Sequence, residues 1–455
     1  MTKKYRFYDQ KQTLLLPLNI QDWIPEDHLA IFISDIVDEM DLTSIYAYYE
    51  CEDRGAPPYD PQMMTKLLIY SYCIGVTASR KIEIKLQEDI AFRYLAAGNF
   101  PDFRTISDFR KIHIDTLEDL FVQVLLLCDA AGLVKLGTVA LDGMKVEANA
   151  SLQNSKQYET ICKEEEHLRK KVRELLQKVE QIDQEEDRLY GEDKRGDELP
   201  SGFQKRKERL QRIHEAKEQL ERRQQQRHEN YQNNLRERGE TEKRTGKKLR
   251  GRKPHPVSKE PDEKLKANTT DPDSRVMKTR KGFVQAYNGQ AAVDTDNQII
   301  VACDLVQDEN DKHQQIPLME KLRNYLGRIP EKLTMDAGYW DEQRLKQLEE
   351  AIDLYVATDK DWKERKKLRE KPAPRGRIPH DLSYKDRMER KLLTKKGKKI
   401  YKKRGSSVEP VFGQIRNRGL GRLLLRRLRK GKGEWFLMCL SHNALKLWRA
   451  QVAPQ

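Results

Sequence analysis

The chain has 455 residues, too many for one compact core, so two or three domains are expected. It carries 87 Lys and Arg against 73 Asp and Glu residues, and the excess lies mainly after residue 360, where 29 basic residues face 8 acidic ones. A field of this sign attracts a polyanion, and nucleic acid is the commonest one inside a cell, although a merely soluble basic surface would have the same composition.

The cysteines and the apolar runs indicate the compartment. The six cysteines have no C-x-x-C spacing, and most lie in apolar runs, so they are interpreted as buried, reduced thiols: Cys51, Cys73, Cys128, Cys162, Cys303 and Cys439. No signal-peptide pattern opens the chain, and no apolar run approaches the roughly 20 residues that a bilayer span requires. We therefore expect a soluble cytoplasmic protein with no membrane partner.

Residues 1 to about 135 are predicted to be helical. Apolar residues recur at intervals of three and four in MMTKLLIYSYCIGV and again from Phe109 to Cys128. Thr105 and Asp108 fit a capping box at the start of this second helix, and Gly132 fits its C-cap. Periodicity does not distinguish a plain helical bundle from a DNA-reading one.

A strand and a long charged segment follow. TVALDGMKVEA is rich in β-branched residues and alternates around Asp142, so it is predicted to be a strand. From about 155 to 250 the chain is charged and Gln-rich, and its apolar residues have coiled-coil spacing. They are Leu168, Val172, Leu175, Val179 and Ile182, continued by Phe203, Leu210, Ile213 and Leu220. Because GEDKRGDELPSG breaks the helix, an antiparallel helical hairpin is predicted, with a structural or dimer-forming role more plausible than direct DNA contact.

Regular α/β signals return after a basic linker, TGKKLRGRKPHP. Strands are predicted in KGFVQAYNGQAAVD and QIIVACDLV, joined by a hairpin turn at DTDNQ. Helix, strand, helix and strand follow in PLMEKLRNYL, KLTMDAG, DEQRLKQLEEA and LYVAT. A very basic connector from 360 to 404 precedes a last helix, expected to start near Ser406. Three strands followed by crossover units predict an α/β layer arrangement.

Three carboxylates are singled out by their places in these elements. Asp142 lies in the middle of a strand, where a carboxylate needs a partner or a metal. Asp336 lies where a strand ends in a Gly turn, the usual edge for sites in α/β sheets. Glu409 lies in the first turn of the predicted helix, where capping is the simpler interpretation. Taken together, the three residues offer only oxygen ligands, which suit Mg²⁺ or Mn²⁺. Three carboxylates can bridge two such ions, and the ions can then act on a phosphodiester.

Three motifs, taken with the order of the elements, resemble those of a known enzyme family. The order of the elements, together with ALDGMKVEA, TMDAGYW and YKKRGSSVEPVFGQIRNR, resembles the DDE transposases of bacterial insertion sequences. The last motif is similar to the family's Tyr, Arg, Glu, Lys/Arg pattern through Tyr401, Arg404, Glu409 and Arg416. It departs from that pattern because four residues rather than three separate Arg404 from Glu409. The run from YDPQMMTKLLIYSY to FRTISDFRKIH resembles the helical domain that precedes the catalytic core in such transposases.

The resemblance implies a fold and an activity. The implied fold is an RNase H-like core, a mixed five-stranded sheet with helices, over 136–455, with a coiled-coil insertion at 155–250 and a helical DNA-binding domain over 1–135. The implied activity is cleavage at the terminal inverted repeats, followed by attack of the freed 3′-hydroxyl on target DNA, in a homodimer on DNA. A nuclease of the same fold that does not join DNA, and a non-catalytic DNA-binding coiled-coil protein, remain alternatives.

The resemblance also implies roles for single residues. Asp142, Asp336 and Glu409 would bind two Mg²⁺ or Mn²⁺ ions. Tyr401, Arg404 and Arg416 would lie near DNA phosphates, for which the planar guanidinium fork is suited. Basic runs such as TKKGKKIYKKR and RRLRK would contact the DNA backbone, so binding is expected to weaken steeply with salt.

The acidic residues around the predicted hairpin turn and the helix after it are interpreted more simply. Asp294 and Asp296 are expected to form the turn, and with Asp304 in the following strand they are rejected as metal ligands. Asp308, Asp311 and His313 precede a predicted helix, where such residues are usually caps.

Two aromatic residues follow Asp336 directly. Tyr339 and Trp340 could stack on an unpaired base at a cleaved DNA end, an interaction worth about 1 to 3 kcal/mol per base in single-strand binders. Packing in the core is the favoured interpretation of both side chains.

Overall fold

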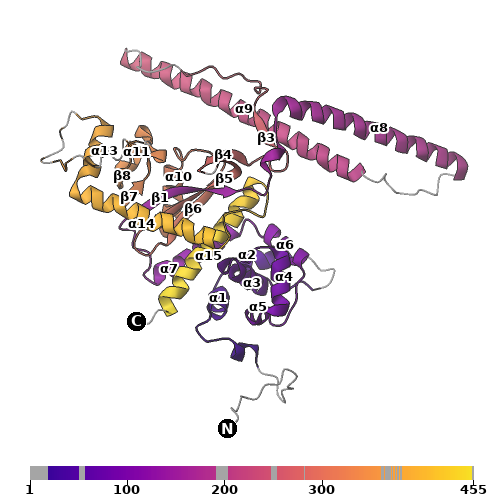
Figure 1. Ribbon diagram of the computed structural model, residues 1–455, viewed down its shortest axis with the longest axis horizontal. Coiled ribbons are helices and arrows are strands. Elements are labelled where there is room, and N and C mark those ends of the chain that lie inside the picture. Colours follow the sequence, from indigo (N-terminus) through magenta and orange to yellow (C-terminus); the bar gives the residue numbers. More distant parts are fainter. Residues whose placement is uncertain are drawn as a thin grey trace, which may run out of the picture. The chain divides into compact units, whose positions relative to one another are not determined.

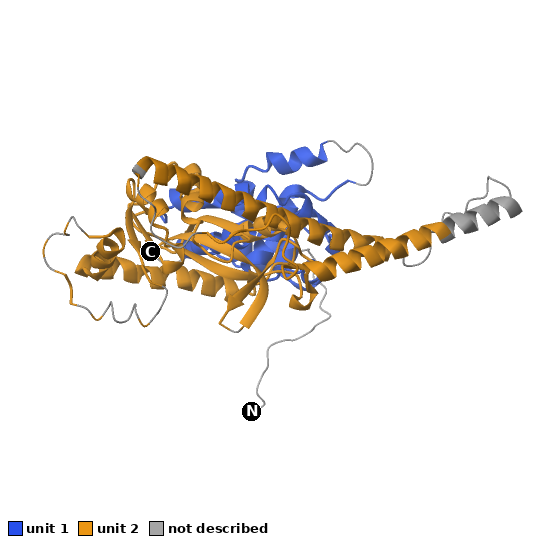
Figure 2. Cartoon of the chain, turned by 90° about the horizontal axis from the view of Figure 1, so that it is seen from above, with its two compact units in different colours: residues 1–134, 437–455 blue, residues 135–436 orange. Residues whose placement is uncertain are grey.

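The computed structural model divides the chain into two compact units (Figure 2). One comprises residues 1–134 with 437–455, and the other residues 135–436. The structure describes residues 19–50, 57–190, 203–246, 254–280, 282–359, 363, 370, 372–374, 376, 379 and 382–452. Within these ranges, no helix has the length and apolar character that a membrane span requires.

The first unit is a helical bundle, which confirms the predicted N-terminal helical region. Its helices are α1 (Leu29–Asp38), α2 (Thr43–Tyr49), α3 (Pro61–Cys73), α4 (Ser79–Glu88), α5 (Ile90–Leu95), α6 (Phe103–Ile112) and α7 (Leu117–Ala130), after a short 3₁₀ helix η1 (Ile20–Trp23). The last part of α15 (Leu428–Val452) belongs to the same unit. Its core includes the fully buried rings of Tyr72, Phe92 and Phe121.

The predicted helix through Phe109 and Cys128 is in fact two helices, α6 and α7. The capping box at Thr105 is wrong, because the N-cap of α6 is Asp102, whose carboxylate accepts a hydrogen bond from the Thr105 N–H at 2.7 Å. The predicted end at Gly132 is confirmed. Gly132 has a φ of 72°, the left-handed conformation that glycine adopts without a Cβ penalty at a helix end.

The second unit is built on one mixed sheet (Figure 1). In the described residues it has six strands: β1 (Val139–Glu147), β4 (Arg275–Thr279), β5 (Gly282–Asp294), β6 (Ile300–Val306), β7 (Lys332–Met335) and β8 (Asp353–Val356). The order is β4-β5-β1-β7-β8, and β6 also pairs with β5. Because β4 and β6 pair with successive halves of β5, the sheet is five strands wide. Its pairs on β5 are antiparallel, and β1-β7 and β7-β8 are parallel, so a mixed sheet consistent with an RNase H-like core is confirmed.

Helices flank this sheet in the predicted order. They are α10 (Gln315–Leu326), α11 (Glu342–Glu349), α13 (Tyr384–Leu393) and α14 (Lys395–Asn417). The expected helix start near Ser406 is wrong, since α14 begins eleven residues earlier, where the Thr394 hydroxyl accepts a hydrogen bond from the Gly397 N–H at 2.9 Å. The Lys-rich run is helical because α14 packs along β1, β5 and β7 through a buried face.

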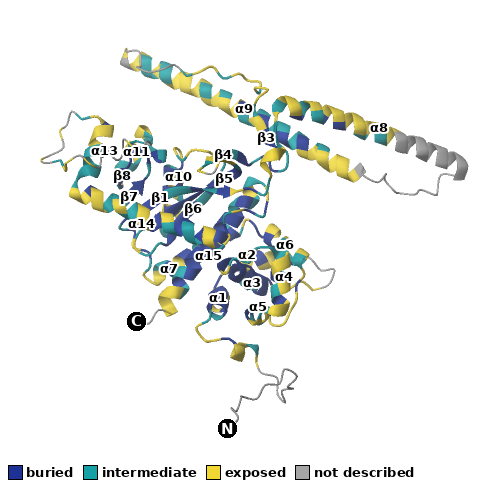
Figure 3. Ribbon diagram, viewed as in Figure 1, coloured by how far each residue is buried: buried dark blue, intermediate teal, exposed yellow. Residues whose placement is uncertain are grey.

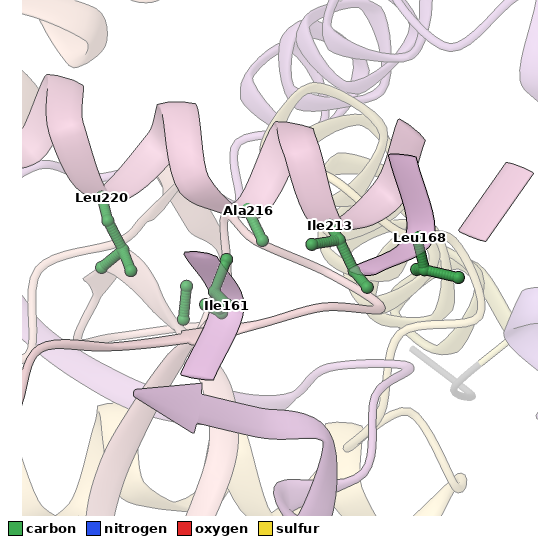
Figure 4. Close-up of a cluster of buried hydrophobic side chains, with 6 residues drawn as sticks. Ile161, Leu168, Ile213, Ala216 and Leu220 are labelled. Carbon is green, nitrogen blue, oxygen red and sulfur yellow. The ribbon is translucent and has the colours of Figure 1, made fainter. Parts of the chain in front are cut away.

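Two long helices lie between β1 and β4 in the chain, α8 (Tyr158–Tyr190) and α9 (Phe203–Thr245). They pack around a small apolar cluster made by Ile161, Leu168, Ile213, Ala216, Leu220 and Ala267 (Figure 4). Tyr158 contacts Glu221 and Glu165 contacts His214, so the two helices run in opposite directions. Away from this cluster their surfaces are mainly exposed (Figure 3).

The predicted seam is confirmed at Leu168, Ile213 and Leu220, which are buried. The helix break at 191–202, the linker residues 247–253, and the side chains of Val179, Ile182 and Phe203 lie outside the described residues. A two-stranded sheet of β2 (Ser155–Gln157) and β3 (Lys266–Asn268), which was not predicted, ties the two ends of the insertion together.

Candidate active site

The register between β1 and β7 brings two of the selected carboxylates to the same level of the sheet. These parallel neighbours pair Val139 with Leu333 and Ala140 with Thr334. Counting two residues on from the second pair places Asp142 beside Asp336. Adjacent strands are about 4.8 Å apart, so the two backbones meet where β7 has just ended and β1 continues.

Asp142 is a mostly buried carboxylate with two partners. Its Oδ1 accepts a hydrogen bond from the Gly143 N–H at 2.9 Å, and its Oδ2 accepts one from Nη1 of Arg404 at 2.8 Å. Burial, with a smaller contribution from the nearby Asp336, raises the pKa of Asp142 to about 6 even though Arg404 and the hydrogen bond from Gly143 lower it. The pKa is raised because two carboxylates share one low-dielectric edge, an arrangement that a bound cation would relieve.

Asp336 lies at the start of a short helical turn, where its side chain has a backbone partner. It is the N-cap of the 3₁₀ helix η3 (Ala337–Tyr339), and its Oδ1 accepts a hydrogen bond from the Gly338 N–H at 2.7 Å. This bond uses one of its oxygens and fixes the direction of the carboxylate. The Gly turn seen in the sequence therefore orients Asp336 at the end of its strand.

Glu409 lies in the middle of α14, so the capping interpretation is wrong. Its carboxylate is 3.6 Å from Nη2 of Arg404, while Nη1 of the same guanidinium holds Asp142. The Glu409 side chain is 62% exposed, whereas that of Arg404 is only 13% exposed. Burial works against the charge of Arg404, but Asp142, Tyr401 and Asp336 together raise its pKa above the usual value. The guanidinium thus links the strand carboxylate to the helix carboxylate.

The other residues of the helix motif lie on α14 with Glu409. Tyr401 is half-buried and near enough to Arg404 to affect its pKa. Arg416 is exposed and follows Glu409 by seven residues, about two helical turns, so it lies on the same side of α14. No hydrogen bond or ion pair joins Arg416 to the other motif residues within the described part of the chain.

Asp311 is a further carboxylate near Asp336, and the interpretation of this residue as a helix cap is wrong. The N-cap of α10 is Gln314, and no side chain caps that helix. Instead, Oδ1 of Asp311 accepts hydrogen bonds from the side-chain amides of Asn288 at 2.7 Å and Gln290 at 2.6 Å. The signal for it in the sequence was the pair of amide side chains, Asn288 and Gln290, two residues apart and so on one face of the buried strand β5.

The neighbours of Asp311 before α10 have other partners. The Asp308 carboxylate accepts a hydrogen bond from the Gln314 side chain at 2.9 Å. His313 is exposed and lies 4.0 Å from Asp341. Neither side chain contacts Asp142, Asp336 or Glu409 in the described residues.

The acidic residues rejected as ligands have the partners of turn and surface residues. Asp294 closes the turn between β5 and β6, accepting the Asp296 N–H at 2.9 Å and the Leu136 N–H at 2.7 Å. Asp304 pairs with Lys432 at 3.0 Å. These contacts agree with the prediction that Asp294, Asp296 and Asp304 are not metal ligands.

The two aromatic residues after Asp336 differ in exposure. Tyr339 is fully buried, and its hydroxyl donates to Oε1 of Gln290, so it is a core residue as predicted. Trp340 is half-buried, with its ring centroid 5.9 Å from that of Tyr384 on α13. Packing accounts for both rings.

The donor set fits a divalent metal ion, although the described residues contain no preformed group of three or more His, Cys, Asp or Glu around one position. The strand-end donors are carboxylate oxygens, which Mg²⁺ and Mn²⁺ prefer, and no sulfur takes part. The five described cysteines are free thiols: Cys73, Cys128, Cys162, Cys303 and Cys439. Two carboxylates held at one strand level, with a third nearby on α14, leave negative charge that a cation would neutralise.

A mixed sheet with acidic residues at the edge of its parallel strands is the framework of a metal-dependent enzyme that acts on phosphodiesters. Residues 246–444 match the family of the transposase DDE domain, and residues 18–112 match a second transposase domain, DUF772. The chain belongs to the DDE transposases of insertion sequences, enzymes that bind DNA, use divalent metals, and cleave and transfer DNA strands. No curated protein and no solved structure matches it.

The two matches cover the candidate site unevenly. Asp336 and Glu409 lie inside the matched DDE domain, whereas Asp142 precedes it. The place of Asp142 therefore depends on the register of β1 and β7 rather than on the family match. The alternative of a non-catalytic scaffolding protein is set aside, because the family is one of enzymes.

Proposed function

We propose that this transposase cuts at the terminal inverted repeats of its own insertion sequence and joins the freed 3′-hydroxyl to target DNA, using Asp142, Asp336 and Glu409 as the ligands of two divalent ions. The observation that carries the proposal is the level register of Asp142 and Asp336 on parallel strands, with the raised pKa of Asp142. Bound ions would activate the attacking hydroxyl and stabilise the charge on the leaving oxygen.

The chain's own residues orient the site. Arg404 holds Oδ2 of Asp142 from α14, and the Gly143 N–H holds Oδ1, so this carboxylate cannot turn away from the strand edge. Glu409 is mainly exposed on the same helix and is free to approach the two strand carboxylates when DNA brings its phosphate. Tyr401 and Arg416 extend this surface along α14 toward the DNA backbone.

A crowded group of arginines supports a DNA path next to the sheet. On α9, burial together with the positive charges of Arg275 and Arg227 lowers the pKa of Arg223 to about 10. Arg275, on β4, is held in place by the backbone carbonyls of Pro272, Asp273 and Ser274. Like charges at close range repel one another, and a phosphate between them would turn this repulsion into attraction. The inserted helices would then contact DNA directly, in addition to any structural role.

The helical unit and the assembly complete the proposal. Residues 18–112 match a transposase domain, and we assign to this N-terminal region, predicted as residues 1–135, the recognition of the inverted repeats. Bringing two element ends together requires two copies, so the active form would be a homodimer on DNA. Its place would be the cytoplasm, with the nucleoid.

The test uses a plasmid that carries the DNA flanking the protein's own gene. The purified full-length protein and its Glu409→Gln variant are incubated with the plasmid, with and without Mg²⁺, and the breaks are mapped. We expect metal-dependent breaks at paired inverted repeats by the unmodified protein and none by the variant. Breaks without strand joining would favour the nuclease alternative, and breaks that persist in the variant would contradict the role of Glu409.

A further inference from the structure

Asp311 lies beside the proposed metal site but is not one of the three carboxylates assigned to that site. Asn288 and Gln290 both donate to the same oxygen, Oδ1, so Oδ2 is left for another partner. Gln290 is in turn held by the hydroxyl of the fully buried Tyr339. Three side chains are therefore used to keep one carboxylate in one position, more than a surface loop residue requires.

Two glycines show how closely Asp311 approaches its neighbours. A Cβ placed on Gly338 would lie 2.8 Å from Oδ1 of Asp336 and 3.1 Å from Oδ2 of Asp311. The two carboxylates thus face one small volume, and their oxygens are no farther apart than these two distances added. A Cβ on Gly143, the residue after Asp142, would lie 2.7 Å from Oδ1 of Asp311. Any larger residue at either position would push Asp311 away.

An independent observation, on the side of Asp311 that faces Gly143, indicates a place for a ligand. Asn288 is fully buried, and its Oδ1 accepts no hydrogen bond in the described structure. This oxygen lies 2.8 Å from the point that a Cβ on Gly143 would occupy, beside Oδ1 of Asp311. An orphaned buried acceptor costs about 1 to 3 kcal/mol, so its retention beside the Asp311 carboxylate points to a cation or to a water that this cation would hold.

The charges around Asp311 are only partly compensated within the chain. Nζ of Lys145 donates to the backbone carbonyl of Glu309 at 2.8 Å rather than to a carboxylate. The negative charges of Asp311, Asp142 and Asp336 all act on this ammonium group. Lys145 and Arg404 together supply two positive charges against the three carboxylates Asp142, Asp336 and Asp311, so one negative charge is left without a cation from these side chains.

We propose that Asp311 is a fourth carboxylate of the metal centre and that its Oδ2 shares a divalent ion with Asp336. The assignment rests on the proposed metal-dependent function. Both oxygens lie close to the point that a Cβ on Gly338 would occupy. Mg²⁺ or Mn²⁺, with ligands at about 2.1 Å, would draw them together on binding. Asn288, Gln290 and Tyr339 are positioning residues that hold Asp311 for this contact.

The first experiment measures Mn²⁺ binding to the full-length protein by titration calorimetry. Asp311→Asn keeps the shape of the side chain and an Oδ1 acceptor for Asn288 and Gln290, but it removes the charge and the free oxygen. We expect it to weaken Mn²⁺ binding about tenfold or more. The matched control is Asp308→Asn, which removes a charge three residues away and should bind Mn²⁺ like the unmodified protein.

A second variant keeps the proposal testable if Asp311→Asn does not fold. Gly338→Ala leaves all carboxylates intact but places a methyl group between Asp336 and Asp311, so it should also weaken Mn²⁺ binding. Mn²⁺ affinity unchanged in both variants overturns the role of Asp311, while cleavage by the unmodified protein would still support the proposed function. If the unmodified protein neither binds Mn²⁺ nor cuts DNA, the proposed function itself fails.

Discussion

Two buried carboxylates of the second unit have opposite surroundings, Asp142 in the sheet and Glu165 on α8. Glu165 is in contact with Arg169 at 2.6 Å, with His214 at 2.8 Å and with Lys217 at 3.0 Å. Burial alone would raise its pKa, but these hydrogen bonds lower the pKa of Glu165 to about 2. Asp142 has one cation and a neighbouring carboxylate, and its pKa rises to about 6.

The difference separates a structural charge from one available for chemistry. The charge of Glu165 is fully compensated within the chain, so it stabilises the contact between α8 and α9. The charges of Asp142 and Asp336 are left partly uncompensated, which costs stability, and in the proposed function the bound ions supply the missing positive charge. The predictions below test this contrast by removing each kind of charge in turn.

The largest effect is expected for Asp336→Asn. The substitution keeps an acceptor for the Gly338 N–H, but it removes one of two neighbouring negative charges, so Mg²⁺-dependent cleavage should fall by on the order of 10³-fold. The thermal midpoint in EDTA should not fall, because repulsion with Asp142 is relieved. A variant that cuts at the normal rate, or one that is clearly destabilised, would contradict the contrast.

Glu165→Gln should show the reverse pattern. Arg169, His214 and Lys217 lose their carboxylate partner, and the packing of α8 against α9 should weaken by about 1 to 3 kcal/mol. Hydrogen exchange of backbone amides in the described part of the hairpin, residues 158–177 and 204–221, measures this loss directly. Glu166→Gln, at an exposed neighbouring position, is the control and should exchange like the unmodified protein.

The pH dependence of that loss follows from the lowered pKa of Glu165. A carboxylate with a pKa near 2 in the folded state and the ordinary value of 4.5 in the unfolded state contributes stability that is fully present above about pH 4.5. The contribution disappears as the pH falls toward 2. The difference in amide protection between the unmodified protein and Glu165→Gln should therefore be large at neutral pH and shrink below about pH 4. A difference that stayed constant down to the acid end would show that shape rather than charge matters at this position.

The sequence predicted which residues belong to the candidate site better than it predicted how these residues lie relative to one another. Asp142 and Asp336 could be selected because a carboxylate inside a strand or at its end is unusual. Their common level could not be predicted, because the pairing of β1 with β7 joins residues almost two hundred positions apart. Glu409 was selected with the wrong helix start, because a Lys-rich run ahead of Ser406 resembles a loop until its buried partners are known.

Asp311 was not selected from the sequence as a site residue. Acidic residues in front of a helix are usually caps, and nothing local distinguishes Asp311 from Asp308. What separates them is the pair of amides from Asn288 and Gln290, 23 and 21 residues earlier, which donate to the carboxylate of Asp311. For Asp308 only the backbone carbonyl accepts a hydrogen bond from Asn288, at 3.2 Å. The α8–α9 insertion was predictable as a packed helix pair because its apolar spacing is local, whereas the charge network of Glu165 depends on which faces of the helices meet.

The smallest effect is expected for the arginines of α9, and it tests whether the insertion is only structural. Arg227 is exposed and close enough to Arg223 to lower its pKa, so it is the most accessible part of the proposed DNA path. Arg227→Ala should weaken DNA binding modestly and lower the slope of log affinity against log salt by about 1, the loss of one phosphate contact. Arg222→Ala is the matched control, because Arg222 lies on the same helix but pairs with Glu218 at 3.3 Å. Equal salt slopes for the unmodified protein and both variants would confine α9 to a structural role. A change in Arg227→Ala alone would place DNA along α9, the helix whose His214 and Lys217 contact Glu165 of α8.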